Sequence, residues 1–235
     1  MAGEAFTILV TIDGNTTNDD NALACDRAHL PGYMSHMSIE EGTRNLLNAG
    51  ANVQHGIAQI YGHGNYGQFG MGSGTAVGDE TTEVMVGGKN WQQYFAPFKH
   101  LNCNIYEISI FACYTGGHDE GKALLNEMAE VSGCIVGAPI GVCSCGDNGI
   151  QYEGWEKVFG PGKGIRAPDD RWHHWPGGIP EHHLDIQGTM YERQSIPFCP
   201  AEELLSSSDK IHVRAVTRVV LTTQSGQSRE PCLSG

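Results

Sequence analysis

Short apolar runs alternate with amphipathic segments over most of the first 140 residues. The run 6–12 is apolar and β-branched and is followed by polar residues typical of a loop, so it predicts a buried strand that enters a long loop. In residues 38–50, Ser38 and Glu41 have capping-box spacing and Gly50 is suited to end a helix. The apolar run 56–61 predicts a second strand. A strand, a helix and a strand in this order imply parallel pairing with a right-handed crossover.

The same alternation continues beyond the second strand. Residues 81–89 predict a short hairpin arm, residues 90–102 a helix interrupted at Pro97, and residues 105–112 a continuous apolar strand at the centre of a sheet. Residues 119–133 predict a helix whose inward face carries Leu124, Met128 and Val131, and residues 134–142 a fourth strand. This order predicts an α/β fold, a three-layer α/β/α sandwich with a mostly parallel central sheet.

The periodic pattern is lost between about Gly146 and Pro200, where glycine, proline, tryptophan and histidine are frequent. Such a stretch is typical of a functional or disordered loop. Residues 210–223 then predict one further strand. We therefore expect a single domain over residues 1–235, with an irregular, loop-rich insertion at about 146–200.

Composition narrows the classes of partner. Lys and Arg number 14 against 27 Asp and Glu, which gives a formal net charge of −13. This charge repels phosphate backbones and anionic bilayers, so we expect neither a nucleic acid nor a membrane as partner. The N-terminal residues lack the basic and apolar regions of a secretory signal. We expect a soluble, cytoplasmic protein whose eight cysteines do not form disulfides.

Two reactive side chains stand at the ends of predicted strands. His63 follows the run 56–61, and Cys113 follows the run 105–112. Because ligands bind at the carboxyl ends of strands in parallel sheets, adjacent strands would bring both side chains to one edge. A thiolate is a nucleophile, and a nearby imidazolium lowers the pKa of its thiol. Gly64 has no side chain, so a substrate carbonyl could approach its amide; the amides of Gly64 and Cys113 are candidate donors to an oxyanion.

These two motifs carry a resemblance to a known group. A strand ending in His-Gly (57–64), followed about fifty residues later by an apolar strand ending in Ala-Cys (106–113), resembles the caspase-like clan of cysteine peptidases. The resemblance covers roughly residues 6–139. It implies a caspase-hemoglobinase fold, Cys113 as nucleophile, His63 as general acid/base and an oxyanion hole at Gly64 and Cys113. The substrate would be a protein or peptide, and an activating partner is possible. The acidic charge argues against the inositol-phosphate cofactor of some relatives, so no cofactor is expected.

The resemblance also suggests where specificity resides. In related peptidases the loop after the first strand and the strand after the cysteine recognise the side chain that precedes the cut bond. In this chain these regions contain carboxylates, which would select Arg or Lys. The candidate substrate-binding residues are Asp13, Asp19, Asp20 and Asp147. Asp is also frequent in turns, and Arg27 is the positive group near the first loop.

Other interpretations fit the same residues. A buried cysteine often acts as a small apolar residue, and an inactive member of this fold would serve as a protein-binding module. A glutamine-amidotransferase type of amidohydrolase also uses cysteine and histidine, but there the histidine follows the cysteine in the chain. His118 follows Cys113 here, in a stretch that indicates a loop or the start of a helix.

We expect no metal site. Thiolate and imidazole are the usual zinc ligands. However, neither the Cys-x-Cys pair nor the adjacent histidines have a recognised zinc spacing. The residues concerned are Cys143, Cys145, His173, His174, His182 and His183.

Overall fold

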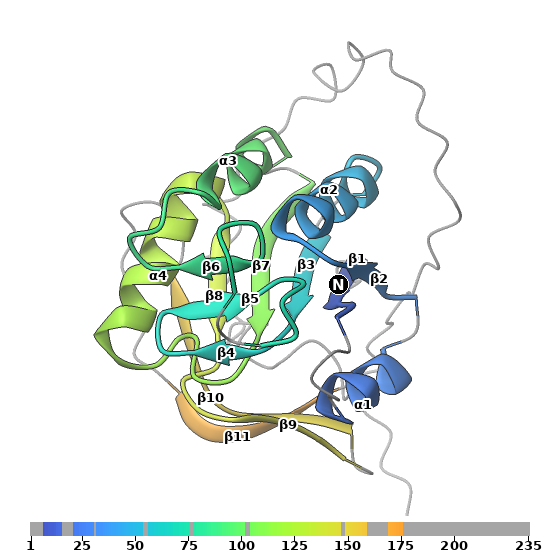
Figure 1. Ribbon diagram of the computed structural model, residues 1–235, viewed down its shortest axis with the longest axis vertical. Helices are drawn as coiled ribbons and strands as arrows, with labels where there is room; N and C mark the ends of the chain where they lie inside the picture. Colours follow the sequence, from blue (N-terminus) through green and yellow to red (C-terminus); the bar gives the residue numbers. More distant parts are fainter. Residues whose placement is uncertain are drawn as a thin grey trace, which may run out of the picture.

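A mostly parallel β-sheet forms the centre of the protein (Figure 1). The computed structural model describes residues 7–15, 21–30, 32–53, 56–75, 78–101, 104–146, 149–158 and 169–175. Within these residues the sheet has the order β11-β10-β8-β7-β3-β1-β2, with β9 paired to β10. The parallel strands are β1 (Thr7–Asp13), β2 (Met34–His36), β3 (Gly56–Tyr61), β7 (Ile105–Phe111) and β8 (Ile135–Ala138).

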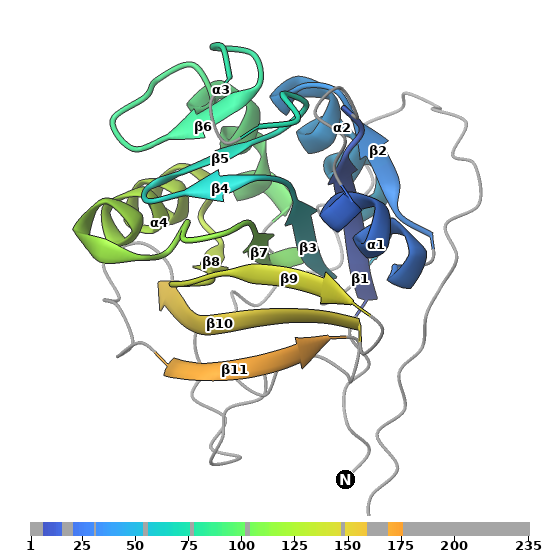
Figure 2. The ribbon, with the colours of Figure 1, turned by 60° about the horizontal axis from the view of Figure 1, so that its bottom comes forward.

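Antiparallel strands extend the sheet at one edge. β10 (Gly149–Val158) pairs antiparallel with β8, and β9 (Cys143–Gly146) and β11 (Asp169–Trp175) flank the other part of β10. Figure 2 shows β9, β10 and β11 as one layer beneath the parallel strands. The sheet therefore curls over one of its own faces at this edge.

Helices lie on both faces of the parallel strands. The first face carries α2 (Ile39–Gly50), the short α3 (Gln92–Phe95), the 3-10 helix η1 (Ala96–Leu101) and α4 (His118–Ser132). The opposite face carries α1 (Asn21–His29) and the β9–β11 layer. The protein is thus an α/β protein with a large, mostly parallel sheet, as predicted.

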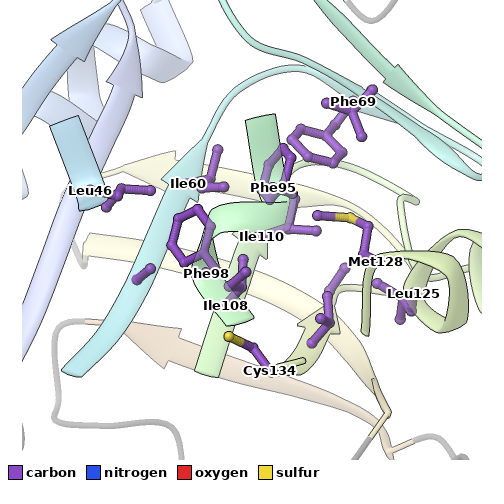
Figure 3. Close-up of a cluster of buried hydrophobic side chains, with 14 of the residues drawn as sticks. Leu46, Ile60, Phe69, Phe95, Phe98, Ile108, Ile110, Leu125, Met128 and Cys134 are labelled. Carbon is purple, nitrogen blue, oxygen red and sulfur yellow. The ribbon is translucent and has the colours of Figure 1, made fainter. Parts of the chain in front are cut away.

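The larger core lies between the parallel strands and the helices of the first face (Figure 3). Because side chains alternate along a strand, β3 and β7 direct every second apolar residue to this face. The side chains that meet there include Ile60, Ile108, Ile110, Phe95, Phe98, Leu125, Met128 and Cys134. This packing holds the ends of β3 and β7 in fixed positions.

A second core, on the opposite face, is aromatic. Leu23 from α1 packs with Tyr61 of β3, Phe111 of β7, and Tyr152 and Trp155 of β10. The rings of Tyr61 and Phe111 are stacked with centroids 4.5 Å apart. These two residues are the last of their strands, so stacking aligns the segments that follow.

A buried ion pair joins the central strand to the antiparallel edge. The Nζ atom of Lys157 on β10 lies 3.0 Å from an Oε atom of Glu107 on β7, and both side chains are at most 1% exposed. Ser109 donates a hydrogen bond to the other carboxylate oxygen at 2.9 Å. Removing either charge would leave its partner buried and uncompensated.

A small antiparallel sheet covers the loop after β3. It consists of β4 (Gly64–Asn65), β5 (Gln68–Gly70) and β6 (Glu83–Met85). The predicted hairpin arm at residues 81–89 is confirmed as β6. The N-cap hydrogen bond, donated by the Glu41 amide to the Ser38 hydroxyl, and the parallel pairing of β1 with β3 are also confirmed.

Two sequence interpretations are wrong. The predicted loop between the first strand and residue 38 contains α1 and β2. The stretch predicted to be irregular contains β10 and β11, where Gly154 has φ +61° and the pairing register shifts between Glu153 and Trp155. Such a bulge interrupts the alternation that identifies a strand. Two other expectations are confirmed: the α-helix over residues 90–102 is interrupted near Pro97, where it gives way to η1, and Val131 packs against the core.

The remaining expectations concern a strand near the C-terminus and membrane-spanning segments. The strand predicted at 210–223 lies outside the described residues. No helix in the described ranges has the length and apolar character that a membrane span needs.

Candidate active site

His63 and Cys113 follow two neighbouring strands at the same edge of the sheet. β3 pairs in parallel with β7, so that Tyr61 lies opposite Phe111, and the Gly62 amide donates a hydrogen bond to the Phe111 carbonyl at 3.3 Å. Each candidate residue comes two positions after this last pair. The expectation that adjacent parallel strands deliver both residues to one edge is confirmed.

The sulfur of Cys113 is held by Cys143. The Cys143 amide donates a hydrogen bond to the Cys113 Sγ at 3.2 Å, and this Sγ lies 3.4 Å from the Cys143 carbonyl oxygen. Cys143 begins β9, so it approaches from the strand layer that curls beneath the parallel sheet. Cys113 as a whole is partly buried.

This environment changes the acidity of both thiols. Hydrogen bonds from the Cys143 side chain and amide, together with the charge of His63, outweigh the effect of burial and lower the pKa of Cys113 to about 6. The pKa of Cys143 is raised well above its usual value, because its side chain bonds to Cys113 and because it is buried. Near neutral pH, Cys113 therefore carries a thiolate while Cys143 remains a thiol.

Gly64 is required by close packing behind the site. A Cβ atom at this position would lie 2.5 Å from the Cys113 carbonyl oxygen and 2.5 Å from the Thr115 hydroxyl. Protein atoms therefore occupy the space that a side chain at position 64 would take. This side of Gly64 is not open to a substrate. The glycine lets the backbone after His63 pack directly against the backbone of Cys113.

The turn after Cys113 is constrained. Tyr114 has φ +60°, an uncommon conformation for a large side chain, and its amide donates to the Gly141 carbonyl at 2.6 Å. The Gly116 amide donates to the Pro139 carbonyl at 2.8 Å. These bonds join the turn to the segment after β8. The positive φ belongs to Tyr114 and not to Cys113 itself.

His118 lies at the first position of α4, beside an aromatic group. Its ring contacts Tyr66 with centroids 4.2 Å apart, and Tyr66 also contacts Tyr114 at 5.2 Å. Tyr66 is 42% exposed. Tyr66 thus packs against Tyr114 in the turn that follows Cys113.

The candidate substrate-binding carboxylates fall into two groups. Asp13 is fully buried, and its carboxylate accepts hydrogen bonds from the amides of Asn15 at 2.8 Å and Gly74 at 3.1 Å. The guanidinium of Arg27 donates to the Asp13 carbonyl. Asp13 therefore organises the loop after β1. Asp19, Asp20 and Asp147 lie outside the described residues.

The expectation that no disulfide forms is wrong. Cys25 on α1 and Cys145 on β9 are joined by a disulfide across 120 residues of sequence. The two cysteines of the Cys-x-Cys motif thus have different partners, Cys113 for Cys143 and Cys25 for Cys145. His173 and His174 lie on β11, while His182 and His183 are outside the described residues.

Sequence reasoning missed the contact between Cys143 and Cys113. The available signal was that Cys143 follows the fourth predicted strand, the next neighbour of the strand that ends before Cys113. Its approach nevertheless depends on the antiparallel strand β10, which the sequence pattern did not reveal. Tyr66 and Tyr114 were also missed, since each is a single aromatic residue in a glycine-rich stretch.

The arrangement combines an acidic thiol, an imidazole at the same sheet edge and a thiol donor on β9. These are the components of nucleophilic catalysis by cysteine. Comparisons of the chain with models of known protein families, with curated proteins and with solved structures find no match.

Proposed function

We propose that the protein is a cysteine peptidase of the caspase-like type, with Cys113 as nucleophile and His63 as general acid/base. The observation that carries the proposal is the hydrogen bond that the Cys143 amide donates to the Cys113 sulfur, in an environment that lowers the pKa of this thiol to about 6. Cys113 lies at the same sheet edge as His63. A buried structural cysteine has the opposite property, as in Cys134, where burial raises the thiol pKa to about 12.

The sheet order agrees with this proposal. A histidine after one parallel strand and a cysteine after its neighbour is the arrangement expected of a caspase-hemoglobinase fold. The helices on both faces of the sheet are also consistent with that fold. We therefore include this fold in the proposal, together with the single-domain organisation.

The reaction begins when the Cys113 thiolate attacks the carbonyl carbon of a peptide bond. The carbonyl electrons move to oxygen, and amides of Gly64 and Cys113 are the proposed donors to this oxyanion. When the oxyanion collapses, the carbon–nitrogen bond breaks and His63 protonates the leaving amine. Water, deprotonated by His63, then attacks the thioester; this step releases the carboxylic acid product and regenerates the thiolate.

Cys143 acts as a positioning residue in this scheme. Its amide and its thiol both bond to the Cys113 sulfur, so they stabilise the thiolate before substrate binds. This stabilisation lowers the thiol pKa but also lowers the nucleophilicity of the sulfur. A thiol with a pKa near the ambient pH is a favourable compromise between the two effects.

Specificity for a basic residue before the cut bond is a further part of the proposal. The carboxylate of Asp13 is engaged with loop amides, so the residues left to bind a basic side chain are Asp19, Asp20 and Asp147. The net charge of −13 also favours basic segments of a protein or peptide substrate.

Reaction with a peptidyl acyloxymethyl ketone tests the proposal. Purified protein is incubated with reagents carrying Arg, Lys, Asp or Leu next to the reactive group, and labelled peptides are identified by mass spectrometry. We expect a covalent adduct on Cys113, formed fastest with the basic reagents. Hydrolysis of a pooled peptide library is measured in parallel.

Three variants serve as controls. Cys113→Ala removes the labelled atom, and His63→Ala is expected to slow labelling and hydrolysis. Cys134→Ala removes a buried thiol that lies beside Ile105, at the opposite end of β7 from Cys113. A folded protein that neither labels at Cys113 nor cuts peptides would contradict the peptidase proposal and favour an inactive, protein-binding module of the same fold. Equal labelling with Asp and Arg reagents would contradict the basic preference alone.

A further inference from the structure

A second group of reactive side chains lies between α1 and β9. Cys25 and His29 belong to α1, and Cys145 belongs to β9. The two sulfur atoms and one ring nitrogen of His29 all lie within 4.8 Å of one another, and each of the three residues is partly exposed. None of the three takes part in the proposed reaction.

The helix explains why two of these groups converge. Residues four positions apart lie on the same face of an α-helix, one turn above the other. Cys25 and His29 have this spacing, and they face the strand that presents Cys145. Side chains alternate along a strand, so Cys145 emerges on the same side of β9 as Cys143, two residues earlier.

The donor set is one that zinc prefers. Zinc–sulfur bonds of about 2.3 Å and zinc–nitrogen bonds of about 2.0 Å place the ligands of a tetrahedral site roughly 3.4–3.8 Å apart. Side chains already within 4.8 Å of one another need only small rotations to reach this spacing. Thiolate and imidazole ligands also favour Zn²⁺ over Mg²⁺ or Ca²⁺, which prefer oxygen.

We propose that Cys25, His29 and Cys145 bind one Zn²⁺ ion when the Cys25–Cys145 disulfide is reduced. A dithiol reductant opens the disulfide by thiol–disulfide exchange, so that the reductant is oxidised to a disulfide and Cys25 and Cys145 become thiols. Zn²⁺ then displaces one proton from each thiol. Two thiolates and one neutral imidazole give a site of zero net charge with the ion, and water from solvent completes the tetrahedron.

The disulfide and the zinc ion thus fasten α1 to β9 under different redox conditions. In the oxidised chain the two sulfurs bond to each other, and in the reduced chain the metal holds them. Because both links join the same residues, the position of β9, and of Cys143 beside Cys113, is kept in either state.

Zinc titration of the full chain in its two redox states tests this proposal. One sample is kept oxidised; the other is reduced with a dithiol, which is removed by gel filtration under an oxygen-free atmosphere. Both are titrated with Zn²⁺ in competition with a fluorescent chelator. We expect the reduced chain to bind one Zn²⁺ more than the oxidised chain, and Co²⁺ in the same site to give thiolate-to-metal charge-transfer absorption.

The His29→Ala variant separates ligand loss from misfolding, because it keeps the disulfide and alters a partly exposed side chain. We expect its reduced form to bind Zn²⁺ at least ~10-fold more weakly, since loss of even an outer partner of a zinc ligand has an effect of this size. A His100→Ala variant, which changes an exposed histidine on η1, should bind as the unaltered chain does. Cys25→Ser should abolish the additional binding.

Two results would overturn the proposal. One is equal zinc binding by the oxidised and reduced chains, which would place any bound zinc at other residues. The other is a reduced His29→Ala variant that retains the affinity and the cobalt spectrum of the unaltered chain.

Discussion

The amide of Cys143 donates a hydrogen bond to the sulfur of Cys113 across 3.2 Å, from a strand that does not belong to the parallel part of the sheet. β9 owes its position to β10, on which Tyr152 pairs with Cys143. The acidity of the candidate nucleophile therefore depends on the antiparallel edge of the molecule as well as on the strand that ends before it.

The pH dependence of alkylation tests this acidity. Because the pKa of Cys113 is lowered to about 6, its thiolate fraction should rise between about pH 5 and 7 and reach a plateau above pH 7. Iodoacetamide modification of Cys113, followed by mass spectrometry, should show this profile. A His63→Ala variant should move the midpoint to higher pH, because the charge of His63 contributes to the lowering.

Cys134 provides an internal control for that measurement. Its burial raises its pKa to about 12, so it should stay unmodified over the whole range in the folded protein. A Cys113 midpoint near the ordinary thiol value of about 8.5 would contradict the environment described for the site.

Replacement of Gly64 by alanine should destabilise the protein. The added methyl group would lie 2.5 Å from the Cys113 carbonyl oxygen, so backbone atoms must move. Overpacking of this kind costs about 1–3 kcal/mol in the free energy of unfolding. Urea denaturation should detect the loss, and labelling of Cys113 should slow as well.

Gly146→Ala is the control for Gly64→Ala, because a Cβ atom at position 146 meets nothing within 4 Å. Its free energy of unfolding should stay close to that of the unaltered chain. If both variants were equally stable, the close approach at Gly64 would be in doubt.

The buried pair of Glu107 and Lys157 should be sensitive to removal of one charge. Glu107→Gln leaves the Lys157 ammonium without its 3.0 Å partner at 1% exposure, which costs about 3–5 kcal/mol in the free energy of unfolding. Glu40→Gln breaks the exposed pair with Arg44 at 3.3 Å and should cost less than about 0.5 kcal/mol. Chemical denaturation of the two variants under one set of conditions makes the comparison; similar losses would rule out a buried pair.

Because Glu156 is buried, we expect the free energy of unfolding to depend on its protonation and to fall as pH rises. Burial raises the pKa of this carboxyl from 4.5 to about 7, with Lys122 opposing the shift. Between these values the folded chain keeps a proton that the unfolded chain has lost, so folding is favoured below pH 4.5 and this contribution is lost as pH rises through 7.

Glu156→Gln removes that titration. The free energy of unfolding of the unaltered chain minus that of the variant should therefore fall from pH 4.5 to 7 and stay constant above pH 7. Glu130→Gln, at an exposed position of α4, should show no such trend. A difference that rises with pH would contradict burial of a neutral Glu156.

The parallel strands could be predicted from sequence because they are continuous apolar runs. The runs that became β3 and β7 also ended at His63 and Cys113, and the geometry of parallel sheets then placed both residues at one edge. α1 was missed because its residues are mostly small or polar and give little amphipathic pattern. β10 was missed because the bulge at Gly154 shifts its register.

Contacts between distant segments could not be predicted in this way. The pairing of Cys25 with Cys145, and the approach of Cys143 to Cys113, join residues that come together only when the whole sheet is assembled. Local pattern therefore identified the two candidate side chains but not the groups that set their chemistry.

The Cys25–Cys145 bond closes a covalent ring of chain that contains both His63 and Cys113. A single proteolytic nick anywhere inside this ring would therefore leave one molecule of unchanged mass apart from the added water. The two pieces would separate on an electrophoresis gel only after a reductant had been added, so a matured form of the protein would go unnoticed on a nonreducing gel.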